Sequence, residues 1–197
     1  MELTGKRIGF ALTGSFCTFE EIMGPLQALV AAGATVYPIM SETAFRLDSR
    51  FGSASRWQAT ITAITGHDII HSIDQAEPIG PNQLFDLVIV APCTGNTLAK
   101  LANAITDTTA TMAVKAHLRN GRPVLLFVST NDGLGLNAKN IGVLLATRHI
   151  FFVPFGQDNP QQKPTSLVAD SSLLLAAAEQ AVVGQQLQPL LIQRKAK

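Results

Sequence analysis

Polar residues that suit ligand binding follow four apolar runs of the sequence. Thr13-Gly14-Ser15 follows RIGFAL, and Ser41 follows TVYPIM. Cys93-Thr94-Gly95-Asn96-Thr97 comes soon after LVIV, and Ser129-Thr130-Asn131-Asp132 follows VLLFV. Each segment offers hydroxyls, amides or bare backbone, and only the last contains a charged side chain. That chemistry favours a phosphate-bearing aromatic ligand over a metal ion.

The first two segments suit a phosphate group. Gly14 lets a ligand approach the backbone closely, and Ser15 and Ser41 supply hydroxyl donors. The start of a following helix adds amide N–H groups with a positive partial charge. The sequence contains neither the GxxxxGK[ST] phosphate loop nor the GxGxxG fingerprint, which argues against a nucleoside triphosphate and a standard dinucleotide mode. The structural alternative for Thr13-Gly14-Ser15 is a strand-to-helix turn with a serine cap.

These segments belong at one edge of a predicted parallel sheet. Strand and helix patterns alternate along the chain, which is typical of an α/β fold with helices on both faces of the sheet. Ligands of such sheets bind outside the carboxyl ends of the strands, so the four segments should lie together. We predict strands over 7–12, 35–40, 87–90, 124–128 and 150–153, and helices over 19–32, 94–104, 108–119, 137–148 and 166–183.

Two parts of the sequence are less regular. Between residues 42 and 81 we predict helices near Phe45 and over 57–65, and a short strand at 69–70. Residues 154–164 (PFGQDNPQQKP) show no periodicity and are predicted to form a loop. The sequence contains no internal repeat or interdomain linker, and its 197 residues suit a single domain over 1–197.

Composition excludes several classes of protein. With 47% hydrophobic residues, 15% charged residues and a net charge of +1, the chain is neither disordered nor a nucleic-acid binder. Two cysteines are too few for a disulfide framework and suit a reducing cytoplasm. No apolar run is long enough to span a bilayer, and the N-terminus lacks a signal-peptide pattern. We therefore expect a cytoplasmic protein that does not bind membranes.

Residues 92–107, PCTGNTLAKLANAITD, resemble the P-x-x-x-N-T-x-A-K-x-A-N-G-I-x-D signature of the homo-oligomeric flavin-containing decarboxylases. That group is flavodoxin-like and binds flavin mononucleotide (FMN). The resemblance implies a flavodoxin-like or Rossmann-like three-layer sandwich with a mostly parallel central sheet. It also implies that Thr13, Gly14, Ser15 and Ser41 hold the FMN phosphate, and that Thr94, Gly95, Asn96 and Thr97 meet the flavin ring and ribityl chain. The matching positions are Pro92, Asn96, Thr97, Ala99, Lys100, Ala102, Asn103, Ile105 and Asp107, and Ala104 replaces the usual glycine.

The segment from STNDGLG to SLVAD, with LTGSFCTF and AEPIGP, is similar to the B-subunit family of dipicolinate synthases from spore-forming Firmicutes. This resemblance covers nearly the whole chain. It implies a partner, the nucleotide-binding A-subunit, through which NAD(P) could enter. The pair would oxidise dihydrodipicolinate, a small dicarboxylate, to dipicolinate in the mother cell during sporulation. Relatives also assemble as homo-oligomers, which implies the same here.

The resemblance implies catalytic roles for Asn96, His71 and Asn131. The decarboxylases use a histidine upstream of the PxxxNT loop, and His71 is the nearest one here, with a side chain suited to proton transfer. Their P-A-M-N-x-x-M-W segment corresponds to VSTNDGLG, in which only Asn131 agrees. Asn131 and Lys163 are candidates for binding substrate carboxylates. No cysteine follows Cys93, which argues against decarboxylation of a cysteine-derived acid.

Several of these residues have structural alternatives. His71 also suits a surface position, and Lys163 a solvated loop. The apolar stripe of Leu98, Leu101, Ala102 and Ile105 leaves Lys100 pointing outward or at a neighbouring copy of the chain. Asn103 would be buried and would need hydrogen-bond partners, Asp107 would be a helix-end carboxylate, and Asp132 would be either a base or part of a turn. Cys93 lacks a paired base or a close cation, so we expect it to be a small buried residue and not a nucleophile.

Three functions remain open at this point. In the first, the chain is a flavin-dependent catalytic subunit of dipicolinate synthase. In the second, it is a non-catalytic binding or scaffolding subunit of that complex, with nicotinamide chemistry on the A-subunit. In the third, it is an FMN-dependent decarboxylase of another acid.

Overall fold

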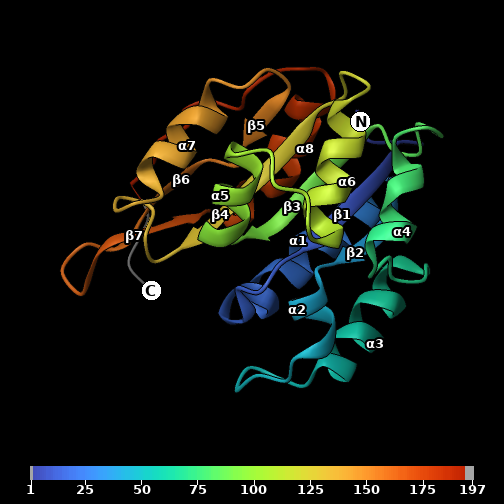
Figure 1. The fold of residues 1–197 in the computed structure, drawn as a ribbon, viewed down its shortest axis with the longest axis horizontal. Helices are drawn as coiled ribbons and strands as arrows, with labels where there is room; N and C mark the ends of the chain where they lie inside the picture. Colours follow the sequence, from blue (N-terminus) through green and yellow to red (C-terminus); the bar gives the residue numbers. More distant parts are fainter. Residues whose placement is uncertain (1, 194–197) are drawn as a thin grey trace.

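Parallel strands form the centre of the sheet (Figure 1). In the computed structural model, which describes residues 2–193, the strands β2 (Thr35–Met40), β1 (Arg7–Leu12), β3 (Leu87–Cys93), β4 (Val124–Thr130) and β5 (Ile150–Phe152) pair in that order, all parallel. This order is that of the flavodoxin-like folds. β3 is buried along its whole length, as a parallel strand covered on both faces must be. The predicted α/β class and mostly parallel sheet are confirmed.

Helices cover both faces of this sheet (Figure 1). The helices α1 (Phe19–Ala31) and α8 (Leu174–Val182) pack together on one face. On the other face lie α5 (Gly95–Ala102), α6 (Thr109–Leu118) and α7 (Ala138–Leu145), with α4 (Ile73–Ala76) against α6. α2 (Glu42–Arg46) and α3 (Ala54–Thr65) cover the β2 side. None of the helices within residues 2–193 has both the length and the apolar character needed to cross a bilayer.

The C-terminal part differs from the sequence-based prediction. Residues 154–164 are not a loop, because β6 (Phe155–Asn159) and β7 (Lys163–Ala169) form an antiparallel hairpin. β7 also pairs with the end of β4, where Thr130 lies opposite Leu167. The predicted helix over 166–183 therefore begins only at Leu174. The predicted strand at 69–70 reduces to a single bridge between Ile39 and Ile70.

One buried histidine couples the fold to pH. His117 of α6 is fully buried, and its Nε2–H donates to the Pro123 carbonyl (3.0 Å). Burial lowers the pKa of His117 from 6.5 to about 4. Because the folded chain then binds fewer protons than the unfolded chain between about pH 6.5 and pH 4, stability is lost as the pH falls through that window.

The variant His117→Gln keeps an N–H donor for Pro123 and removes the titration. Between pH 7 and pH 4 we expect the wild type to lose about 2–3 kcal/mol more unfolding free energy than this variant. Urea denaturation at several pH values measures the difference. If the unfolding free energies of the two proteins changed in parallel with pH, His117 would not be the source of this pH dependence.

Candidate functional site

A cleft of about 230 Å³ lies at the carboxyl ends of β1, β2 and β3. We call it the first cleft. It gathers three of the four polar segments that the sequence singles out, as expected for an open parallel sheet. Its lining residues are Thr13, Gly14, Ser41, Thr43, Thr94, Asn96, Thr97, Lys100 and Thr108.

Thr13 joins the ends of β1 and β3 on this cleft. Its hydroxyl donates to the Pro92 carbonyl (2.7 Å) and accepts from the Thr94 N–H (3.1 Å). Next to it, a methyl group added at Gly14 would lie no closer than 3.4 Å to Thr43 and would meet no backbone. The fold itself therefore does not require a glycine here, and the bare backbone of Gly14 leaves space for a ligand.

Hydroxyl side chains begin the helices around the first cleft. Ser41 caps α2 by accepting from the Ala44 N–H (3.3 Å), which leaves its O–H free to donate. Thr94 caps α5 in the same way, by accepting from the Thr97 N–H (3.2 Å). Ser41 and Thr94 are both predicted to contact a ligand, and these capping hydrogen bonds fix their positions at the cleft.

Gly95 is required by packing. A methyl group added there would lie 2.6 Å from Thr130 Oγ1 and 2.7 Å from Asn137 Nδ2. These distances are closer than a Cβ atom tolerates, so a larger residue at this position would force the Thr130 and Asn137 side chains or the start of α5 to shift. The close approach of α5 to these side chains sets where Asn96 and Thr97 stand.

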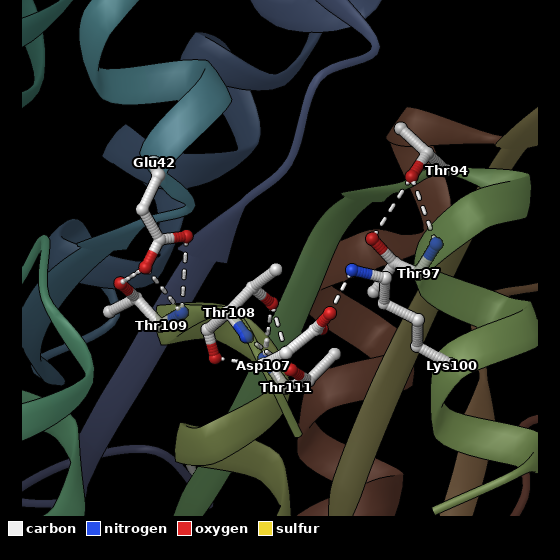
Figure 2. A network of polar contacts seen from close by, with 8 residues as sticks. All are labelled: Glu42, Thr94, Thr97, Lys100, Asp107, Thr108, Thr109 and Thr111. Carbon is white, nitrogen blue, oxygen red and sulfur yellow. Dashed lines mark hydrogen bonds and ion pairs between the residues drawn. The ribbon is translucent and has the colours of Figure 1, made fainter. Parts of the chain in front are cut away.

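Asn96 and Lys100 lie one turn apart on α5, and both line the first cleft. Asn96 is exposed, and its amide makes no hydrogen bond to any residue of the described range 2–193. Lys100 does not simply point outward as the apolar stripe suggests, because its ammonium crosses to Asp107 (2.7 Å; Figure 2). Its spacing from Asn96 is the sequence signal that places it on the cleft.

The helix that follows this ion pair is already capped by protein groups. Thr108 and Thr111 form a reciprocal capping box at the start of α6. The Glu42 carboxylate accepts from both the N–H and the hydroxyl of Thr109 (3.1 and 2.7 Å; Figure 2). The positive end of α6 is therefore satisfied from within the chain.

A second cleft of about 240 Å³ lies on the other side of the Thr13–Ser15 turn. It brings together three predicted residues from distant parts of the chain, namely Ser15, Asn131 and Lys163. They meet because the β6–β7 hairpin folds against the end of β4. The cleft is also lined by Cys17, Thr18, Glu21, Ser129, Thr130, Asp158 and Val168.

Polar contacts fix the walls of the second cleft. Ser15 stands at the N-cap position of the short helix Phe16–Thr18, as the strand-to-helix turn alternative predicts, but its hydroxyl makes no capping hydrogen bond. The hydroxyl instead contacts those of Ser129 (2.9 Å) and Thr18 (3.2 Å). The ammonium of Lys163 pairs with Asp158 across the hairpin (3.1 Å), although its side chain remains half exposed. Lys163 is thus the first residue of a strand and not a loop lysine.

Two other predicted residues lie elsewhere. The imidazole of His71 stacks on Phe45 (4.1 Å between ring centroids), and His71 lines neither cleft. Asp132 accepts from the Leu136 N–H (3.0 Å) and from the side-chain amide of Asn137 (3.1 Å), which supports the turn alternative. His71 as a proton-transfer residue stays a prediction.

The end of α5 corrects two expectations. Asn103 is exposed and not buried, and its amide donates to the Ala99 carbonyl (2.7 Å) at the end of the helix. The next residue, Ala104, has φ +56, a left-handed conformation that explains why the signature has glycine at this position. Ile105 lies beyond the helix and is 46% exposed, so it does not extend the buried stripe.

The two cysteines differ in their surroundings. Cys93 is fully buried, and burial raises the pKa of its thiol well above the ordinary value. Cys17 is exposed at the second cleft. We expect a thiol reagent to modify only Cys17 in the native protein and both cysteines after unfolding, as measured by mass spectrometry. Rapid native modification of Cys93 would contradict its placement in the core.

Among residues 2–193, no group of three His, Cys, Asp or Glu side chains is arranged to bind a metal ion. A sequence profile of the family described as Flavoprotein matches residues 1–180. The chain belongs to the Flavoprotein family. The flavodoxin-like fold expected from the PCTGNTLAKLANAITD segment is therefore confirmed.

Two relatives of this Flavoprotein chain match it along nearly its whole length. It is 49% identical over 191 residues to the B-subunit of dipicolinate synthase from Bacillus subtilis (strain 168), covering 97% of this chain and 96% of that one. The crystal structure of the dipicolinate synthase B-subunit from Bacillus halodurans matches with a TM-score of 0.91 and 48% identity, covering 99% of this chain and all of the other. The resemblance to the B-subunit family is confirmed.

A more distant protein shares the fold alone. Burkholderia xenovorans DmrB, a cubic protein cage for redox transfer solved in complex with FMN, matches with a TM-score of 0.64 and 18% identity. The match covers 88% of this chain and 93% of DmrB.

Proposed function

We propose that this chain binds FMN in the first cleft and acts with the A-subunit of a dipicolinate synthase to oxidise dihydrodipicolinate to dipicolinate during sporulation. The observation that carries the proposal is the gathering of Gly14, Ser41 and Asn96 at one edge of the sheet, in a chain 49% identical to a dipicolinate synthase B-subunit. We further propose that the chain is a single domain acting in the cytoplasm of the mother cell.

The groups present fit this cofactor. The Gly14 backbone and the Ser41 hydroxyl offer an unhindered surface and a free O–H donor for a phosphate. The Asn96 amide offers both donors and an acceptor for the flavin ring or the ribityl hydroxyls, and Thr94 and Thr97 stand beside it. Family membership supports the same cofactor.

The size of the first cleft supports assembly. About 230 Å³ lies below the range of about 300–1,000 Å³ typical of small-molecule sites, so an FMN bound there extends beyond this chain's cleft. We propose that a second copy of the chain completes the site in a homo-oligomer. DmrB, which shares the fold, is described as a cage.

The second cleft is the proposed site of the dicarboxylate. Lys163 has two further N–H donors beside the one facing Asp158, and the Asn131 amide stands on the same cleft. FMN, when bound, supplies the acceptor for the hydride equivalent that the substrate loses as its ring becomes aromatic. The chain's own residues would hold the two carboxylates with the substrate ring facing the Thr13–Ser15 turn, and the part of FMN that extends beyond the first cleft would have to reach that ring for hydride transfer.

A non-catalytic binding subunit is the second candidate. It is favoured by the positions of His71, which lies outside both clefts, and Asp132, which is engaged in a turn. In that case NAD(P) on the A-subunit takes the electrons, and this chain only binds and organises the complex.

Reconstitution separates these functions. Dihydrodipicolinate is incubated with every combination of purified chain, purified A-subunit, FMN and NAD(P)⁺, and dipicolinate is measured by its ultraviolet absorbance. We expect product only when the chain, its A-subunit partner and FMN are all present. Product with NAD(P)⁺ and flavin-free chain would support the non-catalytic alternative. Carbon dioxide release from another acid by the chain and FMN alone would instead indicate a decarboxylase.

A further inference from the structure

Lys100 is the charged side chain of the first cleft. Among the described residues that line this cleft, the other eight are neutral, and all of them except Gly14 carry a hydroxyl or an amide. Hydroxyls, amides and bare backbone bind neutral and anionic ligands alike, whereas an ammonium group favours an anion. The charge preference of the cleft therefore depends on Lys100.

The two carboxylates near Lys100 each accept hydrogen bonds from other residues of the chain and do not line the first cleft. Glu42 accepts from the N–H and hydroxyl of Thr109 at the start of α6, away from Lys100 (Figure 2). Asp107 accepts from Lys100 Nζ (2.7 Å), and this hydrogen bond holds the pKa of the Asp107 carboxyl below its ordinary value.

In this ion pair the positively charged side chain is mostly shielded from solvent, whereas the negatively charged one is exposed. The side chain of Lys100 is 20% exposed, whereas that of Asp107 is 60% exposed. An ammonium has three N–H donors, and the hydrogen bond to Asp107 uses one of them. Two donors remain for a ligand, while Asp107 fixes the direction of the long lysine side chain.

We infer that Lys100 is the specificity-determining residue that makes the first cleft prefer a phosphorylated flavin over an unphosphorylated one, with Asp107 as its positioning residue. This inference rests on the proposed function, because it assumes that a flavin occupies the cleft. A phosphate carries between one and two negative charges at neutral pH, so its hydrogen bond to an ammonium is charge-assisted. Riboflavin has no such group and gains nothing from Lys100.

The test compares FMN with riboflavin, whose ring and ribityl chain are the same. Dissociation constants of both ligands are measured by quenching of flavin fluorescence with wild type, Lys100→Met, Lys100→Arg and Lys139→Met. Lys139 is an exposed lysine of α7 outside the first cleft, so its variant makes the same charge change elsewhere. Circular dichroism and thermal unfolding check that each variant folds.

We expect Lys100→Met to weaken FMN binding by about 10- to 100-fold and riboflavin binding by less than about threefold. Lys100→Arg should restore much of the preference for FMN, and Lys139→Met should leave both affinities unchanged. Equal losses for the two flavins, or no loss of FMN affinity in folded Lys100→Met, would overturn the inference while leaving flavin binding intact. A wild-type chain that binds neither flavin would instead overturn the proposed function.

Discussion

Gly95→Ala should weaken FMN binding at least about tenfold and lower the unfolding free energy by about 1–3 kcal/mol. The added methyl group would meet Thr130 Oγ1 and Asn137 Nδ2 at 2.6 and 2.7 Å, and because both side chains are held by hydrogen bonds to the Asp132 turn, we expect the start of α5 to shift away from them. That movement displaces Asn96, the next residue, from the first cleft. Flavin fluorescence titration and urea denaturation measure the two effects.

Gly80→Ala is the matched control for this change. A methyl group there would lie 2.8 Å from the Ala116 carbonyl oxygen, an overlap of similar size in a place that borders neither cleft. It should lower stability without changing FMN affinity under conditions where the variant is folded. If Gly95→Ala bound FMN as tightly as the wild type, the first cleft would not be the flavin site.

Asn96→Ala should weaken FMN binding about tenfold while the unfolding free energy stays within about 0.5 kcal/mol of the wild type. The amide of Asn96 is exposed and makes no hydrogen bond within residues 2–193, and alanine favours the helix. A loss of FMN affinity in this variant would therefore come from a lost contact with the ligand and not from a change in the fold. Dipicolinate formation by the complex with the A-subunit should fall when FMN is limiting.

Asn103→Ala serves as the comparison at the end of the same helix. Its amide donates to the Ala99 carbonyl and does not border the first cleft, so FMN affinity should be unchanged. Turnover that is intact in Asn96→Ala at every FMN concentration, with the complex assembled, would favour the non-catalytic alternative.

The central sheet was predictable because its strands are continuous apolar runs. β1 and β2 have the predicted bounds, since RIGFAL and TVYPIM are bounded by charged, small or polar residues. β3 extends through Cys93 and β4 through Thr130, beyond the predicted ends, because polar and small residues also pair at the edge of a parallel sheet. Local pattern therefore located the strand ends that line the clefts to within a few residues.

The hairpin β6–β7 could not be read from local pattern. Its polar segment QDNPQQKP shows no alternation, and its stability comes from pairing with the distant end of β4, which lies opposite Leu167 and Val168. Long-range pairing of this kind overrides local propensity. The second cleft, which depends on the hairpin for Lys163, was therefore predicted as separate residues and not as one site.

The position of Lys100 on the first cleft was not predicted, for a different reason. The apolar stripe of α5 identifies which face packs on the sheet, and Leu98 is indeed fully buried. A side chain outside that stripe normally faces solvent, but α5 begins at the carboxyl edge of the sheet, where its other face borders the first cleft. Periodicity assigns a buried face and does not reveal what the remaining face meets.

The proposed function depends first on the binding of FMN in the first cleft. Titration of the purified wild-type chain with FMN, alone and with the A-subunit, tests it most directly through quenching of flavin fluorescence. We expect saturable binding with one FMN per chain, weakened by Asn96→Ala and unaffected by Asn103→Ala. The absence of saturable binding in both samples, or equal affinities in these two variants, would contradict it.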